Sequence, residues 1–249
     1  MEAVNNYIRF FISLKKHSKT VNGYFITGTD TDVGKTVVTA CLATLFKSQG
    51  MDVGVMKPIE TGVDPECSSA ANSDTKFLME ITGNTDQEEE VCPCRLKIPA
   101  SPHQAAQMVG KKIQTSTLLK KFKTLQSRHD MMLVEGVGGL LVPITPKYDV
   151  SDLALETALP LIIVSRLRIG TLNHTLLTIN AARQKGLKIK GIILNNQEGR
   201  TLSDVEEQQG KLIKELSDIP ILGTCPYLKD LSLNGIRKSL LQIQGAFKI

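Results

Sequence analysis

The sequence contains no tryptophan, and aromatic residues make up only 4% of its 249 positions. Proteins that bind single-stranded nucleic acid stack the bases on aromatic side chains along a basic groove. The formal net charge of +5 is small and is spread along the chain, so it does not form the concentrated basic face that such binding requires. We therefore expect no nucleic-acid partner. A mild positive excess instead suits a small anionic ligand.

Cysteine and long apolar runs are also scarce. The five cysteines are an odd number in a chain that is long enough to build a core without disulfide bonds. We therefore expect free thiols in a reducing compartment, which predicts a cytoplasmic protein. No apolar run reaches the roughly 18 residues that a membrane-spanning helix needs, so no membrane partner is expected. The fractions of hydrophobic residues (41%) and charged residues (22%) are typical of a globular protein and exclude a disordered or collagen-like chain.

Residues 1–21 form an extension before the first predicted strand. A short apolar stretch at residues 8–14 precedes Lys15, Lys16 and Lys19. The stretch is too short for a membrane helix, and no small-residue cleavage site follows it, so it does not fit a secretory signal. The sequence leaves open whether the extension is a disordered arm, an additional helix or an artefact of the chosen start codon.

Over residues 22–249, short apolar runs alternate with stretches of helical periodicity. This alternation is typical of a mostly parallel sheet with helices on both faces. No linker or internal repeat divides the segment, so we predict a single α/β domain. The predicted strands cover residues 24–27, 52–57, 131–134, 161–164, 189–194 and 219–222, and the predicted helices cover residues 35–49, 75–81, 103–109, 115–127, 172–184 and 202–216.

Four residues of interest stand at or directly after the ends of predicted strands. They are Gly28, Lys57, Glu135 and Asn195. The carboxyl ends of parallel strands meet at one edge of a sheet, where ligands collect. We therefore expect these four positions to share one site.

Residues 28–36 read GTDTDVGKT and lie between a predicted strand and a predicted helix. This is the context of a nucleotide phosphate loop, in which backbone N–H groups surround a phosphate, a lysine adds positive charge and a hydroxyl ligates Mg²⁺. Lys35 and Thr36 supply the last two groups, although Thr29 stands where the strict pattern has glycine. A glycine-bearing turn that binds nothing is the alternative, but the order of strand, loop and helix favours a P-loop NTPase-like fold.

Two carboxylates are candidate Mg²⁺ ligands, because Mg²⁺ bound with ATP takes one or two protein carboxylates besides phosphate oxygens. Glu135 follows an apolar strand and precedes a run of glycines that lets backbone approach a phosphate. A solvated strand end is its alternative interpretation. Asp74 begins a predicted helix, where capping and the helix dipole favour an acidic residue without any ligand. From its position alone, Asp74 fits a structural role better than a metal role.

Lys57 follows the second predicted strand, directly before Pro58. An isolated lysine there is usually a surface charge. Its position predicts that it projects onto the same edge as Lys35, however. Two lysines and a metal provide more positive charge than nucleotide binding needs, which indicates a second anion, the acceptor of a transferred phosphoryl group.

Other catalytic patterns are missing from the sequence. Cys92 and Cys94 have no second pair at metal-binding spacing, and the four histidines form no ligand-like cluster. No G-x-S-x-G nucleophile motif occurs. Phosphoryl transfer is therefore the best-supported chemistry.

Eight short segments then follow one another along residues 23–228. They are GTDTDVGKT at 28–36, KP at 57–58 with TG at 61–62, NSD at 72–74, SPH at 101–103, VEGVGG at 134–139, GTLNH at 170–174, NN at 195–196 and PYL at 226–228. In this combination the chain resembles the dethiobiotin synthetase family. Many relatives share the phosphate loop, whereas its combination with the KP, SPH and GTLNH segments is far more specific.

The resemblance implies a role for each site residue. Lys57 and Lys35 would be the catalytic lysines, and Thr61 and Gly170 would contact substrate. Thr36, Asp74 and Glu135 would bind Mg²⁺, which reverses the structural interpretation of Asp74. Nucleotide contacts are implied for Asp32, Val33, Gly34, Lys35, Thr36, Val37, Asp74, Glu135, Gly136, Val137, Gly138, Asn195, Asn196, Pro226, Tyr227 and Leu228.

The resemblance also implies the reaction, which is the ATP-dependent closure of the ureido ring of dethiobiotin from 7,8-diaminononanoate and CO₂ in biotin biosynthesis. One amine would capture CO₂ as a carbamate, and the γ-phosphoryl group of ATP would convert this into a carbamic-phosphoric anhydride. The second amine would then close the ring and expel phosphate. In the family, the helix end at Gly170 comes from the partner subunit, which implies a homodimer.

Two other functions share this nucleotide domain. An amide ligase of the cobyrinic acid diamide synthase type normally carries an added glutaminase domain, for which the chain has too few residues. A partition-type nucleotide switch carries a second lysine near the start of the phosphate loop, where this chain has Thr29 and Asp30. Both alternatives stay open at this stage.

Overall fold

The computed structural model describes residues 23–64 and 73–249. The predicted extension at residues 1–21 lies outside the described residues. Within the described part of the chain, no helix has the length and apolar character needed to cross a membrane.

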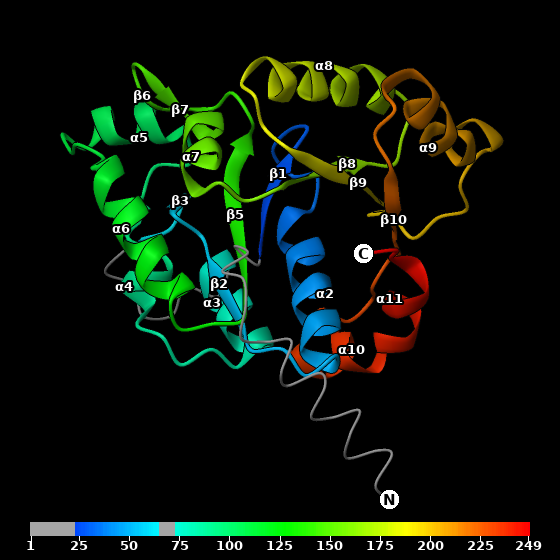
Figure 1. Cartoon of the computed structure of the whole chain (residues 1–249), viewed down its shortest axis with the longest axis horizontal. Helices are drawn as coiled ribbons and strands as arrows, with labels where there is room; N and C mark the ends of the chain where they lie inside the picture. The colour runs from blue at the N-terminus through cyan, green and yellow to red at the C-terminus, as the bar shows by residue number, and fades with distance from the viewer. Residues whose placement is uncertain (1–22, 65–72) are drawn as a thin grey trace, which may run out of the picture.

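The centre of the domain is a six-stranded sheet with the order β10-β9-β8-β1-β5-β2, and every neighbouring pair is parallel. These strands are near-continuous apolar runs because helices cover both faces of the sheet. The mostly parallel α/β sheet predicted from the sequence is therefore confirmed (Figure 1). The sheet strands are β1 (Gly23–Gly28), β2 (Val53–Met56), β5 (Met131–Gly139), β8 (Leu161–Arg166), β9 (Ile189–Asn195) and β10 (Ile221–Cys225).

Helices pack on both faces, and side chains that alternate along the strands divide the core into two clusters. Ile26 and Leu133 lie in the cluster with α2, α3, α10 and α11, whereas Phe25 and Met132 lie in the cluster with α6, α7, α8 and α9. This alternation is the period-2 geometry of a strand. The helices are α2 (Lys35–Ser48), α3 (Asp74–Thr82), α4 (Glu88–Val91), α5 (Pro102–Met108), α6 (Thr115–Gln126), α7 (Val150–Thr157), α8 (Thr171–Gln184), α9 (Asp204–Ser217), α10 (Leu233–Lys238) and α11 (Leu240–Ala246).

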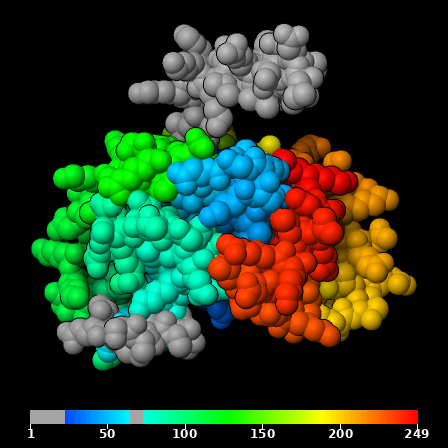
Figure 2. All heavy atoms as spheres, turned by 90° about the horizontal axis from the view of Figure 1, so that it is seen from below, coloured from blue at the N-terminus to red at the C-terminus, as the bar shows by residue number. Residues whose placement is uncertain are grey.

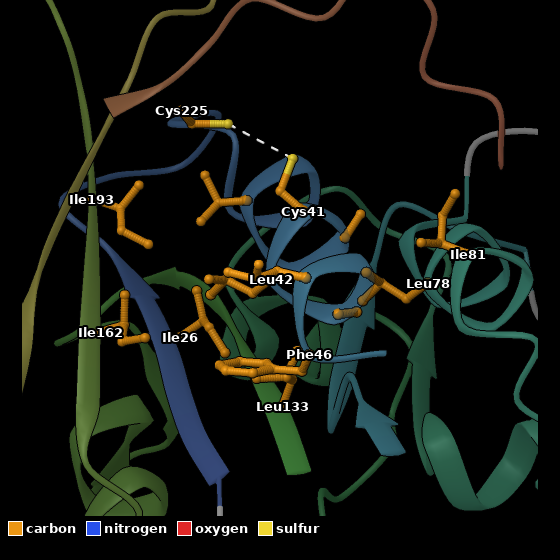
Figure 3. Packing of buried hydrophobic residues seen from close by; sticks show 14 of the residues in the cluster. Ile26, Cys41, Leu42, Phe46, Leu78, Ile81, Leu133, Ile162, Ile193 and Cys225 are labelled. Atoms are coloured by element: carbon orange, nitrogen blue, oxygen red, sulfur yellow. Dashed lines mark hydrogen bonds between the residues drawn. The ribbon is translucent and has the colours of Figure 1, made fainter. Parts of the chain in front are cut away.

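Helix α2 is the central element of the first cluster. Leu42 and Phe46 point from α2 toward strand residues such as Ile26 (Figure 3). The C-terminal helices α10 and α11 pack beside α2 (Figure 2). Because α2 is buried along its length, the phosphate loop at its start rests on a fixed support.

Cys41 of α2 faces Cys225 at the end of β10, with 3.9 Å between the two sulfur atoms (Figure 3). The neighbouring Cys225 thiol and burial both raise the pKa of Cys41. The four described cysteines are free, which agrees with the thiols expected from the sequence.

Some predicted boundaries are wrong. The predicted strand at 219–222 is shifted to β10, which begins after Pro220, since proline has no N–H to donate to a strand ladder. Short strands that the sequence pattern did not reveal pair outside the main sheet, β3 with β4 in parallel and β6 with β7 antiparallel. Their bounds are β3 (Ile59–Thr61), β4 (Cys94–Leu96), β6 (Pro143–Thr145) and β7 (Tyr148–Asp149).

Strand β5 also runs further than predicted. It was expected to end at residue 134, with Glu135 beyond it, but it continues to Gly139 through a shift in register against β1. Glycines tolerate such a bulge because they have no side chain to collide with neighbouring backbone. Glu135 therefore lies inside the strand, opposite Ile26, and is fully buried.

Candidate functional site

The phosphate loop between β1 and α2 is held by side chains from the ends of β8 and β9. Gln197 and Arg166 each donate a side-chain N–H to the carbonyl of Asp32 at 3.0 Å. Asn195 Nδ2 donates to the carbonyl of Val33 at 2.9 Å. These bonds satisfy two carbonyl oxygens of the loop, so the backbone N–H groups are the ones suited to an anion.

Gly34 joins this loop to α2 with a backbone φ of 84°, in the left-handed region. A Cβ at this position would collide with the amide of Asn195. No side chain caps the start of α2, so the N–H groups of its first turn face the cavity beside Lys35 without a side-chain acceptor. The helix N-terminus therefore provides the partial positive charge that favours a phosphate.

A lysine and two carboxylates form the centre of the site. Lys57 Nζ lies 2.6 Å from Asp74 Oδ2 and 2.5 Å from Glu135 Oε1. Thr36 Oγ1 donates to the same Glu135 oxygen at 2.8 Å. Lys57 and Glu135 are buried, whereas 41% of the Asp74 side chain is exposed. Residues up to 99 positions apart in the sequence thus meet at one point.

Electrostatics distinguish the two lysines. Burial alone would lower the pKa of Lys57, but the charges of Glu135 and Asp74 outweigh burial and raise it above its ordinary value. Burial lowers the pKa of Lys35 to about 8, although Glu135 partly offsets this effect and Lys57 adds to it. Lys57 is therefore held as a cation by its partners. The positive charge of Lys35 is less well compensated than that of Lys57, so a bound anion would stabilise it.

The residues fit a divalent cation. Hard cations such as Mg²⁺ prefer oxygen ligands. Asp74 and Glu135 present carboxylate oxygens to the ammonium of Lys57, and the Thr36 hydroxyl lies beside one of these oxygens. Glu135 Oε2 is buried and has no hydrogen-bond partner. Across residues 23–64 and 73–249, no three His, Cys, Asp or Glu side chains converge on a metal position. A cation here would therefore complete its coordination with the Thr36 hydroxyl and with phosphate oxygens.

Glu60 is a site residue for which the sequence analysis assigned no role. Its buried carboxylate accepts hydrogen bonds from the Asp74 backbone N–H at 2.5 Å, the Ser73 hydroxyl at 3.0 Å and the Thr75 hydroxyl at 2.7 Å. It thereby fixes the first turn of α3 and positions Asp74. The signal for it was a carboxylate inside a short apolar segment, three residues after Lys57. Arg166 and Gln197 gave no comparable signal.

A cavity of about 370 Å³ lies at this edge of the sheet. Lys35 and Lys57 both line it, as the strand order predicted. Glu60 and Gln197 line it as well, without having been predicted. The predicted site residues that the cavity brings together are Asp32, Gly34, Lys35, Thr36, Lys57, Thr61, Asp74, Glu135, Val137 and Gly138.

The other predicted site residues lie outside this cavity. Val33 and Gly170 line a second hollow of about 260 Å³ at the start of α8. Val37 packs against the hydrophobic core. Gly136 is buried next to the ring of Phe25. The remaining ones are Asn195 and Asn196 at the end of β9, and Pro226, Tyr227 and Leu228 after β10, of which Tyr227 is partly exposed beside Gly199.

Comparison with known proteins identifies relatives over nearly the whole domain. A family model described as an AAA domain matches residues 22–234. An ATP-dependent dethiobiotin synthetase from Thermodesulfovibrio yellowstonii is 38% identical over 227 residues, which cover 88% of this chain and 95% of that protein. The enzyme of the same name from Bacillus licheniformis is 39% identical, with coverage of 85% and 88%. The one from Nitrosopumilus maritimus is 36% identical, with coverage of 90% and 98%.

Solved structures show the same fold in more distant proteins. The cell division ATPase MinD from Pyrococcus furiosus has a TM-score of 0.53 at 15% identity, covering 91% of this chain and 98% of that chain. A ParA family ATPase from Chlorobium tepidum has a TM-score of 0.53 at 15% identity, with coverage of 90% and 91%. These similarities confirm the P-loop NTPase-like fold. At this identity they carry no information about activity.

The contacts of Glu60 predict a stability effect. We expect Glu60→Gln to lower the free energy of unfolding at pH 7 by roughly 1–3 kcal/mol, because the amide cannot accept all three hydrogen bonds that reach the carboxylate. Urea unfolding followed by circular dichroism measures this. Glu80→Gln changes an exposed carboxylate on α3, the helix whose first turn Glu60 contacts, and as the control it should change stability by less than about 0.5 kcal/mol. Equal stability of the two variants would contradict the role given to Glu60.

Proposed function

The chain belongs to the ATP-dependent dethiobiotin synthetase family, and from this premise we propose how its cavity forms dethiobiotin. The protein is an ATP-dependent ligase of biotin biosynthesis. We propose ATP, CO₂ and 7,8-diaminononanoate as its substrates. Two lysine ammonium groups line one cavity beside the phosphate loop, and this arrangement supports the proposal for the site.

The reaction needs two anions to be brought together. A carbamate oxygen must approach the γ-phosphate of ATP, and the two groups repel each other. Lys35, at the start of α2, is placed to neutralise the phosphate. Lys57, which follows β2 at the same edge of the sheet, is placed to neutralise the carbamate and the phosphoryl group that passes between them. Positioning and charge compensation supply most of the catalysis in phosphoryl transfer, so little covalent work is left for the protein.

The proposed reaction has three steps. One amine nitrogen of the diamine attacks CO₂ and loses a proton, which gives a carbamate. A carbamate oxygen attacks the γ-phosphorus and expels ADP, which gives the mixed anhydride. The second amine attacks the carbonyl carbon, loses a proton and expels phosphate, which closes the ureido ring. The enzyme's residues bind and orient these groups.

Thr36, Asp74 and Glu135 would hold Mg²⁺ in this reaction. When bound, the ion supplies positive charge to the oxygens of the β- and γ-phosphates. Glu60 keeps Asp74 in place through the first turn of α3. Because Glu135 lies within β5 rather than on a loop, its carboxylate is fixed by the sheet.

Three further assignments complete the proposal for the site. Thr61 contacts the diamine from the cavity wall. Asn195 recognises adenine, since a side-chain amide offers both a donor and an acceptor to N6 and N7, and its amide nitrogen also reaches the phosphate loop. Residues 195–196 and 226–228 stand together at the ends of β9 and β10, where Asn196 N–H donates to the Cys225 carbonyl, and this proximity supports a shared role at the base.

We also propose a homodimer in the cytoplasm. Gly170 begins α8 with a φ of 93°, and the exposed N-terminus of that helix suits the carboxylate tail of a substrate bound by the partner subunit. The exposed Ile169 and Leu177 at α8 support burial of this surface in a dimer. The free thiols support a reducing compartment.

The first test concerns the dependence on the diamine. Purified protein with Mg-ATP and bicarbonate should release phosphate only after 7,8-diaminononanoate is added, and the dethiobiotin formed can be measured by mass spectrometry. Turnover without the diamine, stimulated by a partner protein or by lipid, would favour the nucleotide switch. Turnover that requires glutamine or ammonia would favour the amide ligase.

The second test concerns Lys57. We expect Lys57→Ala to lower turnover by about 10²- to 10³-fold, because a positive charge aimed at the transferred phosphoryl group is lost. Binding of ATP should stay nearly intact, since Lys35 and the loop remain. Steady-state kinetics and calorimetry measure the two effects. Lys185→Ala removes a lysine that pairs with Asp152 far from the cavity and should leave both unchanged. An unchanged rate for Lys57→Ala would remove Lys57 from the mechanism.

The third test concerns the dimer. Sedimentation should give a dimer for the unaltered protein. Ile169→Asp should shift it toward monomer and lower turnover, because a charge enters an apolar interface. Leu241→Asp, at a position on α11 that is 83% exposed, is the matched control and should stay dimeric. A monomer that retains full activity would contradict the shared site.

A further inference from the structure

The ammonium of Lys57 lies where the predicted metal ligands converge. Its nitrogen is 2.6 Å from Asp74 Oδ2 and 2.5 Å from Glu135 Oε1. Thr36 Oγ1 donates to the same Glu135 oxygen. Two of the three side chains that would bind Mg²⁺ therefore already contact one cation, which belongs to the protein, and the third is hydrogen-bonded to one of them.

Geometry makes the two cations exclusive at these oxygens. Mg²⁺ binds carboxylate oxygens at about 2.0–2.1 Å. An ion at that distance from both Asp74 Oδ2 and Glu135 Oε1 would take the two oxygens that the ammonium of Lys57 contacts at 2.6 and 2.5 Å, and the two positive charges would repel each other at close range. For the ion to bridge the two carboxylates, the lysine must leave them.

Electrostatics point the same way. The charges of Glu135 and Asp74 favour the charged form of Lys57. A divalent cation that joined it at these oxygens without an anion would add two positive charges beside a buried ammonium, which is costly. A cation that arrives with a triphosphate brings negative charge and offsets this cost.

We propose that Lys57 is the resident counter-ion of the Asp74 and Glu135 carboxylates, and that it is released toward the acceptor anion when a divalent cation enters with the nucleotide. This inference rests on the proposed function and deepens it. Lys57 lines the cavity beside Thr61, so the released ammonium stays within the space that the diamine would occupy. The positive charge needed by the carbamate thus becomes available only when the phosphoryl donor is present.

Binding of Mn²⁺ to the nucleotide-free, full-length protein tests this exchange. Free Mn²⁺ is measured by electron paramagnetic resonance, with neither ATP nor the diamine present. We expect the unaltered protein to bind Mn²⁺ weakly and Lys57→Met to bind it at least about tenfold more tightly, which is the lower end of the coupling between close charges. Equal or weaker binding by Lys57→Met would overturn the proposal.

Two controls show where the more tightly bound Mn²⁺ sits. Lys185→Met removes a lysine from a carboxylate pair elsewhere and should leave Mn²⁺ binding unchanged. Adding Glu135→Gln to Lys57→Met should abolish the tighter binding, and its persistence would place the ion elsewhere and overturn the proposal. Since no substrate takes part, failure here leaves diamine-dependent turnover as a separate question.

A second measurement uses the unaltered protein and so does not depend on the folding of a variant. In a crystal structure with Mn²⁺ and a non-hydrolysable ATP analogue, anomalous scattering should place Mn²⁺ between Asp74 and Glu135, with Lys57 Nζ more than about 3.5 Å from both carboxylates. Mn²⁺ bound through Glu135 Oε2 while Lys57 keeps both its contacts would overturn the exchange.

Discussion

Burial of the Lys57 ammonium is the constraint on which the site depends. A buried charge is tolerated only when it is paired and hydrogen-bonded. Lys57 meets this requirement with Glu135 from inside β5 and Asp74 from the start of α3. Asp74 is held in turn by Glu60, whose carboxylate accepts from the Asp74 N–H and two hydroxyls. The pair is therefore part of a network that joins the sheet to α3, and its geometry is set before any ligand arrives.

The order of the strands explains why this network meets the phosphate loop. Strand β5 lies between β1 and β2, so the loop after β1, the carboxylate of β5 and the lysine after β2 share one edge. Strands β8 and β9 lie on the other side of β1, and their ends supply Arg166, Asn195 and Gln197 to the loop. The ends of β8 and β9 thus support the backbone of the phosphate loop from one side. The lysine after β2 places positive charge on the other side. That arrangement suits the proposed reaction, in which the two reacting groups are both anions.

The parts that could be predicted from the sequence depend on local patterns. Apolar runs separated by helical periodicity were enough for the parallel sheet, and GTDTDVGKT was enough for the loop, since both are properties of neighbouring residues. Glu60, Arg166 and Gln197 could not be found in this way. Their partners lie 13 or more positions away along the chain, and their role comes from hydrogen bonds that form only when the strands pack. The end of β5 was missed because the glycines that suggest a turn in a sequence also permit a bulge within a strand.

The sequence by itself determined the fold class, the phosphate loop and the family, because period, glycine placement and the order of short segments are written along the chain. It also brought Lys35 and Lys57 to one edge through the rule for parallel strands. Only the tertiary structure decided which oxygens surround Lys57, that Asp74 faces it from the first turn of α3, and that Glu60 fixes Asp74. Contacts of this kind depend on distances of 2.5–3.0 Å between side chains remote in sequence, and packing alone fixes such distances.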